Sequence, residues 1–255
     1  MLTELTKPSP NFLGIEFRSG SYEDIARELD QLSRSDAFSY VVTPNVDHVL
    51  MLHPREPDAM SDQFRQAYDA AKLTLCDSRI LQRLARFRGV ELDLITGSDL
   101  TPYMFQNGYL SGRKVAIIGG DAGMPPELHQ RYPTIDLVQH VPPIGVLHNP
   151  DAIQQIVHFI ERERSDFVLF AIGSPGSEII AHRCSVAGNA RGVGLCIGAS
   201  IEFLLGRKQR APQWMQRLSL EWAFRLYKEP ARLWRRYIVT GPRVFWPAAT
   251  AHKAR

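Results

Sequence analysis

Several runs of apolar residues in this chain end in acidic or small polar residues, and the acid of greatest chemical interest is Asp77. It comes directly after the apolar residues 73–76. A carboxylate in this position could act as a general base that takes a proton from an attacking hydroxyl group. Asp77 could equally be the N-cap of the helix predicted over residues 78–88, because Asp is a preferred capping residue. Both interpretations stay open at this point.

Three further polar residues, Thr43, Asn45 and Asp99, occupy similar positions along the chain. Each has an ordinary structural alternative as a helix cap or a turn former. If the apolar runs are parallel strands, all of these side chains belong to the edge of the sheet where ligands bind. They are therefore candidates for contact with a substrate.

Glycine-rich turns follow three of the apolar runs: Gly119 and Gly120, Gly173 with Ser174, and Gly198. Glycine lets backbone N–H groups approach a phosphate closely, and the N-terminus of a following helix favours negative charge. Tight turns between strands and helices also use glycine without any ligand. Neither G-x-G-x-x-G nor a P-loop is present, so the turns indicate a nucleotide-type ligand without a dinucleotide signature.

The sequence predicts no metal and no cofactor. The three cysteines, Cys76, Cys184 and Cys196, lie far apart without C-x-x-C spacing, which favours reduced thiols in the cytoplasm over a disulfide framework or a zinc site. No D-x-D pair stands at a strand end to hold Mg²⁺ on a diphosphate. If the substrate is a sugar nucleotide, cationic side chains must stabilise the leaving diphosphate.

The elements that would position these residues alternate between strand and helix. Helical patterns, such as residues 21–35 and the helix that Asn149 and Pro150 begin, separate the apolar runs. This order predicts an α/β fold whose parallel sheet is covered by helices on both faces. Strands are predicted at residues 40–42, 73–76, 115–118, 167–172 and 193–197.

The C-terminal part has a different composition. Residues 207–243 hold ten Lys or Arg and two Glu, a local charge of +8 against +3 for the whole chain, so the remainder carries −5. All four tryptophans lie in or just after this segment, and the pattern from residue 212 is helical only. We therefore predict an α/β catalytic domain at residues 1–206 and a basic helical appendage at residues 207–255.

Such an appendage suggests an anionic partner: a membrane surface, a nucleic acid or a phosphorylated ligand. Alternatively, its tryptophans pack into the core and its arginines are merely solvated. No signal peptide is evident at the N-terminus, and the longest apolar stretch, residues 167–172, is far shorter than the roughly 20 residues that span a bilayer. Any membrane contact is therefore expected to be peripheral.

The motifs together resemble the WecG/TagA/CpsF family of bacterial glycosyltransferases, collinearly from about residue 14 to residue 237. The clearest part is residues 194–237, which combines G-x-x-x-x-R-A-P, L-E-W-x-x-R-L and E-P-x-R-L-x-R-R-Y. The other matching segments are VVTPNVDHV (41–49), TLCDS (74–78), TGSDL (96–100), VAIIGG (115–120) and FAIGSPGSE (170–178).

This resemblance implies an inverting, metal-independent transferase on a mostly parallel, Rossmann-like sheet. It implies a UDP-sugar donor and an undecaprenyl-diphosphate-linked acceptor at the inner face of the cytoplasmic membrane. Asp77 matches the proposed catalytic base of the family, and Thr43 with Asn45 matches its T-x-N segment. The arginines that match its R-A-P motif and its appendage, where diphosphate or headgroup contact is expected, are Arg210, Arg232, Arg235 and Arg236.

The chain departs from the family pattern at three places. Ser78 replaces the glycine that usually follows the aspartate, the usual P-K-Q-E stretch ends here in Gly176-Ser177-Glu178, and Glu202 replaces a usual aspartate. The last two places are expected donor-site turns, so they bear on the identity of the donor. They are more similar to the exopolysaccharide glucosyltransferase (GumM-like) branch than to the N-acetylmannosaminyl branch.

Two other classes of protein are alternatives to a glycosyltransferase. A nucleic-acid-binding module would use the basic aromatic appendage, but the acidic strand-end residues would repel phosphates. A nucleotide-dependent oxidoreductase would use the same type of sheet, but the dinucleotide fingerprint is absent. The sequence does not identify the donor sugar, the acceptor glycan or the oligomeric state. A homo-oligomer stays open as an alternative to a monomer.

Overall fold

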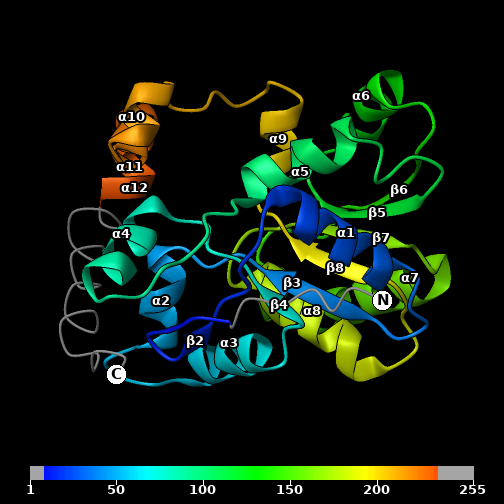
Figure 1. Cartoon of the computed structure of the whole chain (residues 1–255). Helices are drawn as coiled ribbons and strands as arrows, with labels where there is room; N and C mark the ends of the chain where they lie inside the picture. Colours follow the sequence, from blue (N-terminus) through cyan, green and yellow to red (C-terminus); the bar gives the residue numbers. More distant parts are fainter. Residues whose placement is uncertain (1–8, 235–255) are drawn as a thin grey trace, which may run out of the picture.

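The computed structural model describes residues 9–234, and its centre is a six-stranded sheet (Figure 1). All its strand pairs are parallel, and the strand order is β4-β3-β8-β7-β5-β6. The α/β prediction is therefore confirmed. The strands are β3 (Ser39–Val42), β4 (Leu73–Thr74), β5 (Lys114–Gly119), β6 (Asp136–His140), β7 (Phe167–Ala171) and β8 (Val193–Cys196), and a separate two-stranded antiparallel hairpin joins β1 (Asn11–Phe12) to β2 (Ile15–Glu16).

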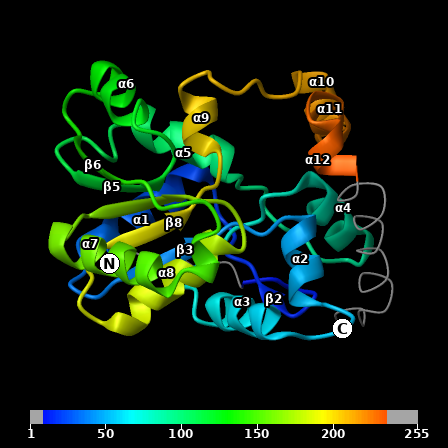
Figure 2. The same cartoon turned by 180° about the vertical axis from the view of Figure 1, so that it is seen from behind.

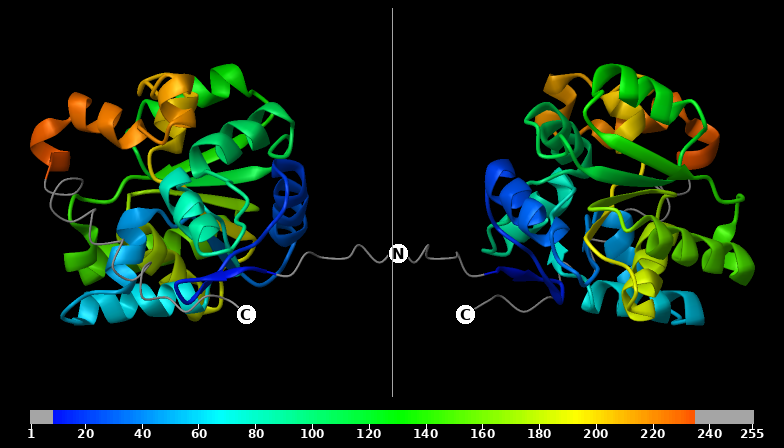
Figure 3. Two further views of the ribbon diagram at one scale, coloured as in Figure 1. Left: turned by 60° about the vertical axis from the view of Figure 1, so that its left-hand side comes forward. Right: turned by 90° about the vertical axis from the view of Figure 1, so that its right-hand side faces the viewer.

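The central strands are apolar throughout because both of their faces are buried. In β7, Phe167 and Leu169 belong to one hydrophobic core, while Val168 and Phe170 belong to the other. Successive side chains of a strand point to opposite faces, so an uninterrupted apolar run supplies both cores at once. Figure 3 shows the sheet between its two layers of helices.

The helices divide between the two cores. Buried residues of α1, α5, α6 and α9 lie in one core, and those of α2, α3, α4, α7 and α8 lie in the other. Their bounds are α1 (Tyr22–Ser33), α2 (Val46–Leu52), α3 (Ala59–Asp69), α4 (Arg79–Phe87), α5 (Gly97–Gln106), α6 (Met124–Arg131), α7 (Pro150–Glu163), α8 (Gly176–Ala187) and α9 (Ser200–Leu204), with a short 3-10 helix η1 (Val146–His148) before α7.

Local signals account for two of the predicted helix starts. The Ser21 side chain accepts from the backbone N–H of Asp24, and the Asp24 carboxylate accepts from the backbone N–H of Ser21, which completes a capping box. Asn149 caps α7 by accepting from the N–H of Ala152, and Pro150 occupies the first helical position.

Three short helices follow the sheet: α10 (Gln213–Arg217), α11 (Glu221–Lys228) and α12 (Pro230–Trp234). They lie together on one side of the molecule, next to α4 (Figures 1 and 2). Neither α10 nor α11 contains a buried residue, and Trp214 and Trp234 are 60% and 49% exposed. The alternative in which these two tryptophans pack into the core is therefore wrong. The division into domains at residue 206 stays a prediction.

The turn after β5 allows a test of the close packing at the strand ends. Gly119 has a φ of +101°, and a Cβ built on it would stand 2.7 Å from the backbone oxygen of Ala171. We expect Gly119→Ala to destabilise the protein by about 2–4 kcal/mol, from the left-handed backbone and the clash together. Gly108→Ala is the control, because Gly108 has a φ of +76° with open space around it. It should cost only the backbone part, about 1–2 kcal/mol.

Urea denaturation of both variants measures this difference. Equal losses of unfolding free energy in the two variants would contradict the close contact between the ends of β5 and β7.

Candidate active site

A cavity of about 1190 Å³ lies beyond the carboxyl ends of the parallel strands. The turns after β3, β4, β7 and β8 line it, as the general rule for open parallel sheets predicts. A smaller cavity of about 310 Å³, which reaches Gly120, shares Ala171, Gly198 and Glu202 with the large one. The predicted site residues that line the large cavity are Thr43, Asn45, Asp77, Gly173, Ser174, Glu178, Gly198 and Glu202.

Asp77 stands at the start of the turn that leads to α4, but it does not cap this helix. The N-cap is Ser78, whose hydroxyl oxygen accepts from the N–H of Leu81 at 3.3 Å. The backbone N–H of Asp77 donates to the carbonyl of Pro44 at 3.0 Å, which ties the end of β4 to the end of β3. The interpretation of Asp77 as the cap of α4 is therefore wrong.

The surroundings of Asp77 set its acidity. Burial raises the pKa of Asp77 to about 7. The charge of Arg225 and a hydrogen bond from the backbone N–H of Gly97 oppose this shift of the pKa, while the charge of Glu221 adds to it. A carboxyl whose pKa lies near neutrality is suited to exchange a proton at physiological pH.

Hydrogen bonds hold the side chains of Thr43 and Asn45 in place just after the end of β3. The Thr43 hydroxyl donates to the carbonyl of Cys196 at 3.0 Å, and Asn45 caps α2 by accepting from the N–H of Asp47 at 2.9 Å. A Cβ on Gly97 would stand 3.4 Å from Oγ of Ser200 and 3.7 Å from Oγ1 of Thr43. The turns after β3 and β8 and the start of α5 thus meet at this part of the cavity.

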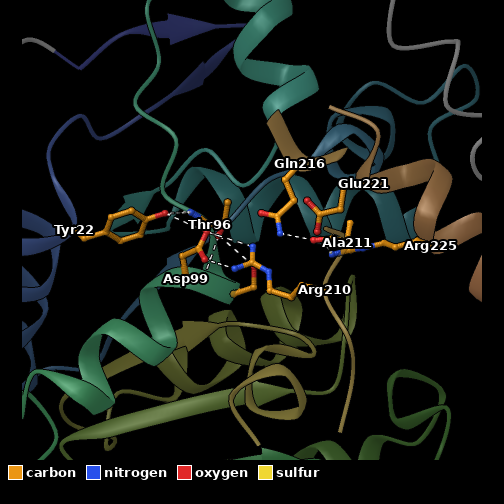
Figure 4. A network of polar contacts seen from close by, with 9 residues as sticks. Tyr22, Thr96, Asp99, Arg210, Ala211, Gln216, Glu221 and Arg225 are labelled. Carbon is orange, nitrogen blue, oxygen red and sulfur yellow. Dashed lines mark hydrogen bonds and ion pairs between the residues drawn. The ribbon is translucent and has the colours of Figure 1, made fainter. Parts of the chain in front are cut away.

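Arg210 and Asp99 are joined to each other instead of lining the cavity (Figure 4). Arg210 donates to both carboxylate oxygens of Asp99, and the Thr96 hydroxyl donates to one of them at 2.7 Å. Burial alone would raise the pKa of Asp99, but these hydrogen bonds and the charge of Arg210 lower it overall. This ion pair attaches the segment before α10 to the first turn of α5.

Several other predicted site residues either lie away from the two cavities or have side chains that the structure does not describe. Gly119 lines neither cavity, and its contact with Ala171 accounts for the glycine there. Arg232 belongs to α12, but its side chain is not among those that the structure describes. Arg235 and Arg236 lie outside the described residues.

Four cationic side chains of the basic C-terminal segment line the cavity, although the sequence singled out none of them individually. They are Arg207, Lys208, Arg225 and Lys228. Arg207 pairs with Asp121 and Glu127 at 2.5 and 2.6 Å, and Lys208 pairs with Glu202 at 2.6 Å. Arg225 belongs to the L-E-W-x-x-R-L motif, so the signal for it was present in the sequence.

A buried polar cluster forms another part of the cavity wall. Glu178, at the start of α8, is only 2% exposed, and its Oε1 lies 3.9 Å from Nδ1 of His48. This nitrogen is also 2.6 Å from the hydroxyl of Tyr68. Burial raises the pKa of Glu178 to about 7, although hydrogen bonds from its own backbone N–H and from Ser174 oppose the shift. Sequence spacing does not reveal this cluster, because three separate helices contribute to it.

The described residues contain no group of three or more His, Cys, Asp or Glu side chains arranged to hold a metal ion. Nor does any helix within residues 9–234 have the length and apolar character needed to cross a bilayer.

Comparison with protein families agrees with the α/β fold and the cavity at its edge. The model of the glycosyl transferase WecG/TagA/CpsF family matches residues 10–255, nearly the whole chain. The protein is therefore a glycosyltransferase. It belongs to the WecG/TagA/CpsF family, as the resemblance implied.

The buried carboxyl of Glu178 generates a prediction about stability. Its pKa is raised from 4.5 to about 7 on folding, so the folded state binds a proton more tightly than the unfolded state does. The stability that protonated Glu178 contributes is complete below pH 4.5 and is lost as the pH rises through 7, by about 3 kcal/mol. We expect Glu178→Gln to remove this loss and to be more stable than the wild type at pH 8.

Chemical denaturation between pH 4.5 and 8 tests the prediction. Wild type and Glu178→Gln should differ more at pH 8 than at pH 4.5. A difference that is independent of pH would show that Glu178 stays ionised in the folded protein.

Proposed function

We propose that this protein is an inverting, metal-independent glycosyltransferase. It transfers a sugar from a UDP-sugar to an acceptor glycan linked to undecaprenyl diphosphate, in the synthesis of exopolysaccharide or another cell-surface glycan. The GumM-like pattern of the donor-site turns favours glucose as the transferred sugar; the alternative within the family is N-acetylmannosaminyl transfer. Family membership supports sugar transfer itself, and the residues around the cavity support the finer assignments.

The observation that carries the proposal is the position of Asp77 at the cavity together with its raised pKa. Its carboxyl lines a large cavity at the ligand edge of the sheet, has a pKa near 7 and does not cap α4. Cationic side chains of the C-terminal segment line the same cavity. A proton acceptor and cationic side chains in one cavity are what displacement of a diphosphate by a hydroxyl group requires.

In the proposed reaction, the oxygen of an acceptor hydroxyl attacks the anomeric carbon of the donor. A new C–O bond forms as the bond from the anomeric carbon to the UDP oxygen breaks, and UDP leaves with the electron pair of this bond. Asp77 takes the proton of the attacking hydroxyl. Because the displacement occurs once, it inverts the anomeric centre and converts an α-linked donor into a β-linked product.

The departing UDP carries negative charge that must be stabilised. Arg225 and Lys228 of α11 line the cavity and are exposed, so both can contact the diphosphate. Arg207 and Lys208 also line it, and carboxylates pair with them just as Glu221 pairs with Arg225 at 3.3 Å. Fixed cations can supply this stabilisation without a metal ion. Turnover in excess EDTA is then expected to match turnover with added Mg²⁺.

The acceptor's polyprenyl chain belongs in a membrane, so the enzyme must work at a bilayer surface. We assign membrane contact to the basic appendage of residues 207–243, at the inner face of the cytoplasmic membrane. Trp214 and Tyr227 are 60% and 82% exposed, and aromatic rings beside cations suit the interface of an anionic bilayer.

Asp77→Asn tests the assignment of the base. We expect turnover to fall by a factor of about 10²–10⁴, because Asn cannot accept the proton. Thermal stabilisation by UDP should persist, because the carboxylate acts on the acceptor. The measurements are UDP release with a polyprenyl-diphosphate-linked acceptor and a thermal-shift titration. Turnover near that of the wild type would exclude Asp77 as the base.

The pH dependence of kcat/KM gives a second test. With a base of pKa about 7, kcat/KM should fall about tenfold per unit below pH 7. Arg225 lowers the pKa of Asp77 and Glu221 raises it, so Arg225→Gln should move the midpoint of the profile upward and Glu221→Gln should move it downward.

The two variants remove opposite charges from the same helix and serve as controls for each other. Shifts in the same direction, or no shift in either variant, would contradict electrostatic control of Asp77 by α11.

A further inference from the structure

An exposed face that combines apolar and basic side chains extends beyond the appendage onto the α/β body. On α4, Phe87 is 83% exposed, and Arg83 and Arg86 are exposed beside it. Residues three and four positions apart lie on the same side of a helix, so these three side chains share one face. The opposite side of α4 carries the buried Leu81 and Ala85.

This face of α4 is continuous with α10. Arg83 donates to the backbone carbonyls of Arg217 and Leu218, at 2.7 and 3.2 Å. Leu218 and Trp214, one helical turn apart, are 55% and 60% exposed. We call the whole surface the α4–α10 face, and it consists of Arg83, Arg86, Phe87, Trp214, Arg217 and Leu218. Figures 1 and 2 show α4 next to the appendage helices.

The charge of this surface identifies the kind of partner. Three arginines of the α4–α10 face, Arg83, Arg86 and Arg217, are exposed, and neither α4 nor α10 contains an acid. Exposed apolar side chains among cations are complementary to a surface that is apolar inside and anionic outside. A second copy of the chain is a poor partner, because its own α4–α10 face would bring arginines against arginines.

We infer that the α4–α10 face docks on an anionic lipid surface, with α4 of the α/β body as a second contact beside the appendage. This inference rests on the proposed function, in which the acceptor is lipid-linked. The contact gives α4 a positioning role. Since Asp77 directly precedes Ser78, the N-cap of this helix, docking through α4 would fix the carboxyl end of β4 at the membrane surface.

The test is sedimentation of the full chain with vesicles of phosphatidylcholine containing phosphatidylglycerol. The variant is Arg86→Gln with Phe87→Ser, since neither side chain forms a hydrogen bond, ion pair or ring contact among the described residues. Loss of one cation should weaken binding about fivefold, and loss of the ring should weaken it further. The matched control is Arg65→Gln with Val186→Ser, which removes an exposed cation and an exposed apolar side chain from α3 and α8.

The expected result is weaker sedimentation of the α4 variant alone. Sedimentation that is unchanged in the α4 variant, equally reduced in the control, or independent of phosphatidylglycerol would overturn the inference. So would a change of oligomeric state in the α4 variant, which would assign the face to a second copy. UDP-induced thermal stabilisation is measured in parallel, because its absence from a wild type that binds vesicles would count against the proposed function and leave the lipid face standing.

Discussion

The parallel direction of all six strands is the constraint on which the site depends. In a parallel sheet every strand ends at the same edge, so residues from four separate turns surround one cavity. Burial of both faces of the sheet makes the strands apolar, and the first polar residue after each strand therefore stands at the boundary between core and cavity. Asp77 is such a residue, and the burial that comes with this position raises its pKa to about 7.

The C-terminal segment adds positive charge to the cavity, which the turns at the edge of the sheet do not supply. The ion pair of Arg210 with Asp99 attaches this segment to the first turn of α5, and α11 then carries Arg225 and Lys228 to the cavity. Arg210 is thus better placed to hold the appendage than to bind a free diphosphate, whereas the two cations of α11 line the space where a ligand would lie. Burial is the main cause of the raised pKa of Asp77, and the same segment adjusts this pKa through the opposing charges of Arg225 and Glu221. Acid–base chemistry and the position of the appendage are therefore coupled in this fold.

The sequence predicted the strands that bury both faces and the turns that follow them, because apolar runs are a local signal. It did not predict β6, since Asp136–His140 is an edge strand that contains polar residues and is only partly buried. It also could not distinguish Asp77 from Ser78 as the cap of α4, because adjacent residues of this kind can both cap a helix. The pairing of Arg210 with Asp99 and the cluster of His48, Tyr68 and Glu178 join residues 20 to 130 positions apart, and no local pattern encodes such contacts.

The half-buried Asp77 and the buried Glu178 line one cavity with raised pKa values, and this is costly for the folded protein at neutral pH. Ionisation of Asp77 or of Glu178 lowers the free energy of unfolding of the protein, because burial disfavours the charged form of each carboxyl. For Asp77 the cost has a function in the proposed reaction, since a base of pKa about 7 can accept a proton near neutral pH. Glu178 has no comparable role in the proposed reaction, and its neighbours His48 and Tyr68 are polar groups drawn from α2 and α3. A neutral Glu178 adds no negative charge to a wall that already carries other carboxyls, Asp77 and Glu202 among them, and so reduces the charge that the cations of α11 must balance.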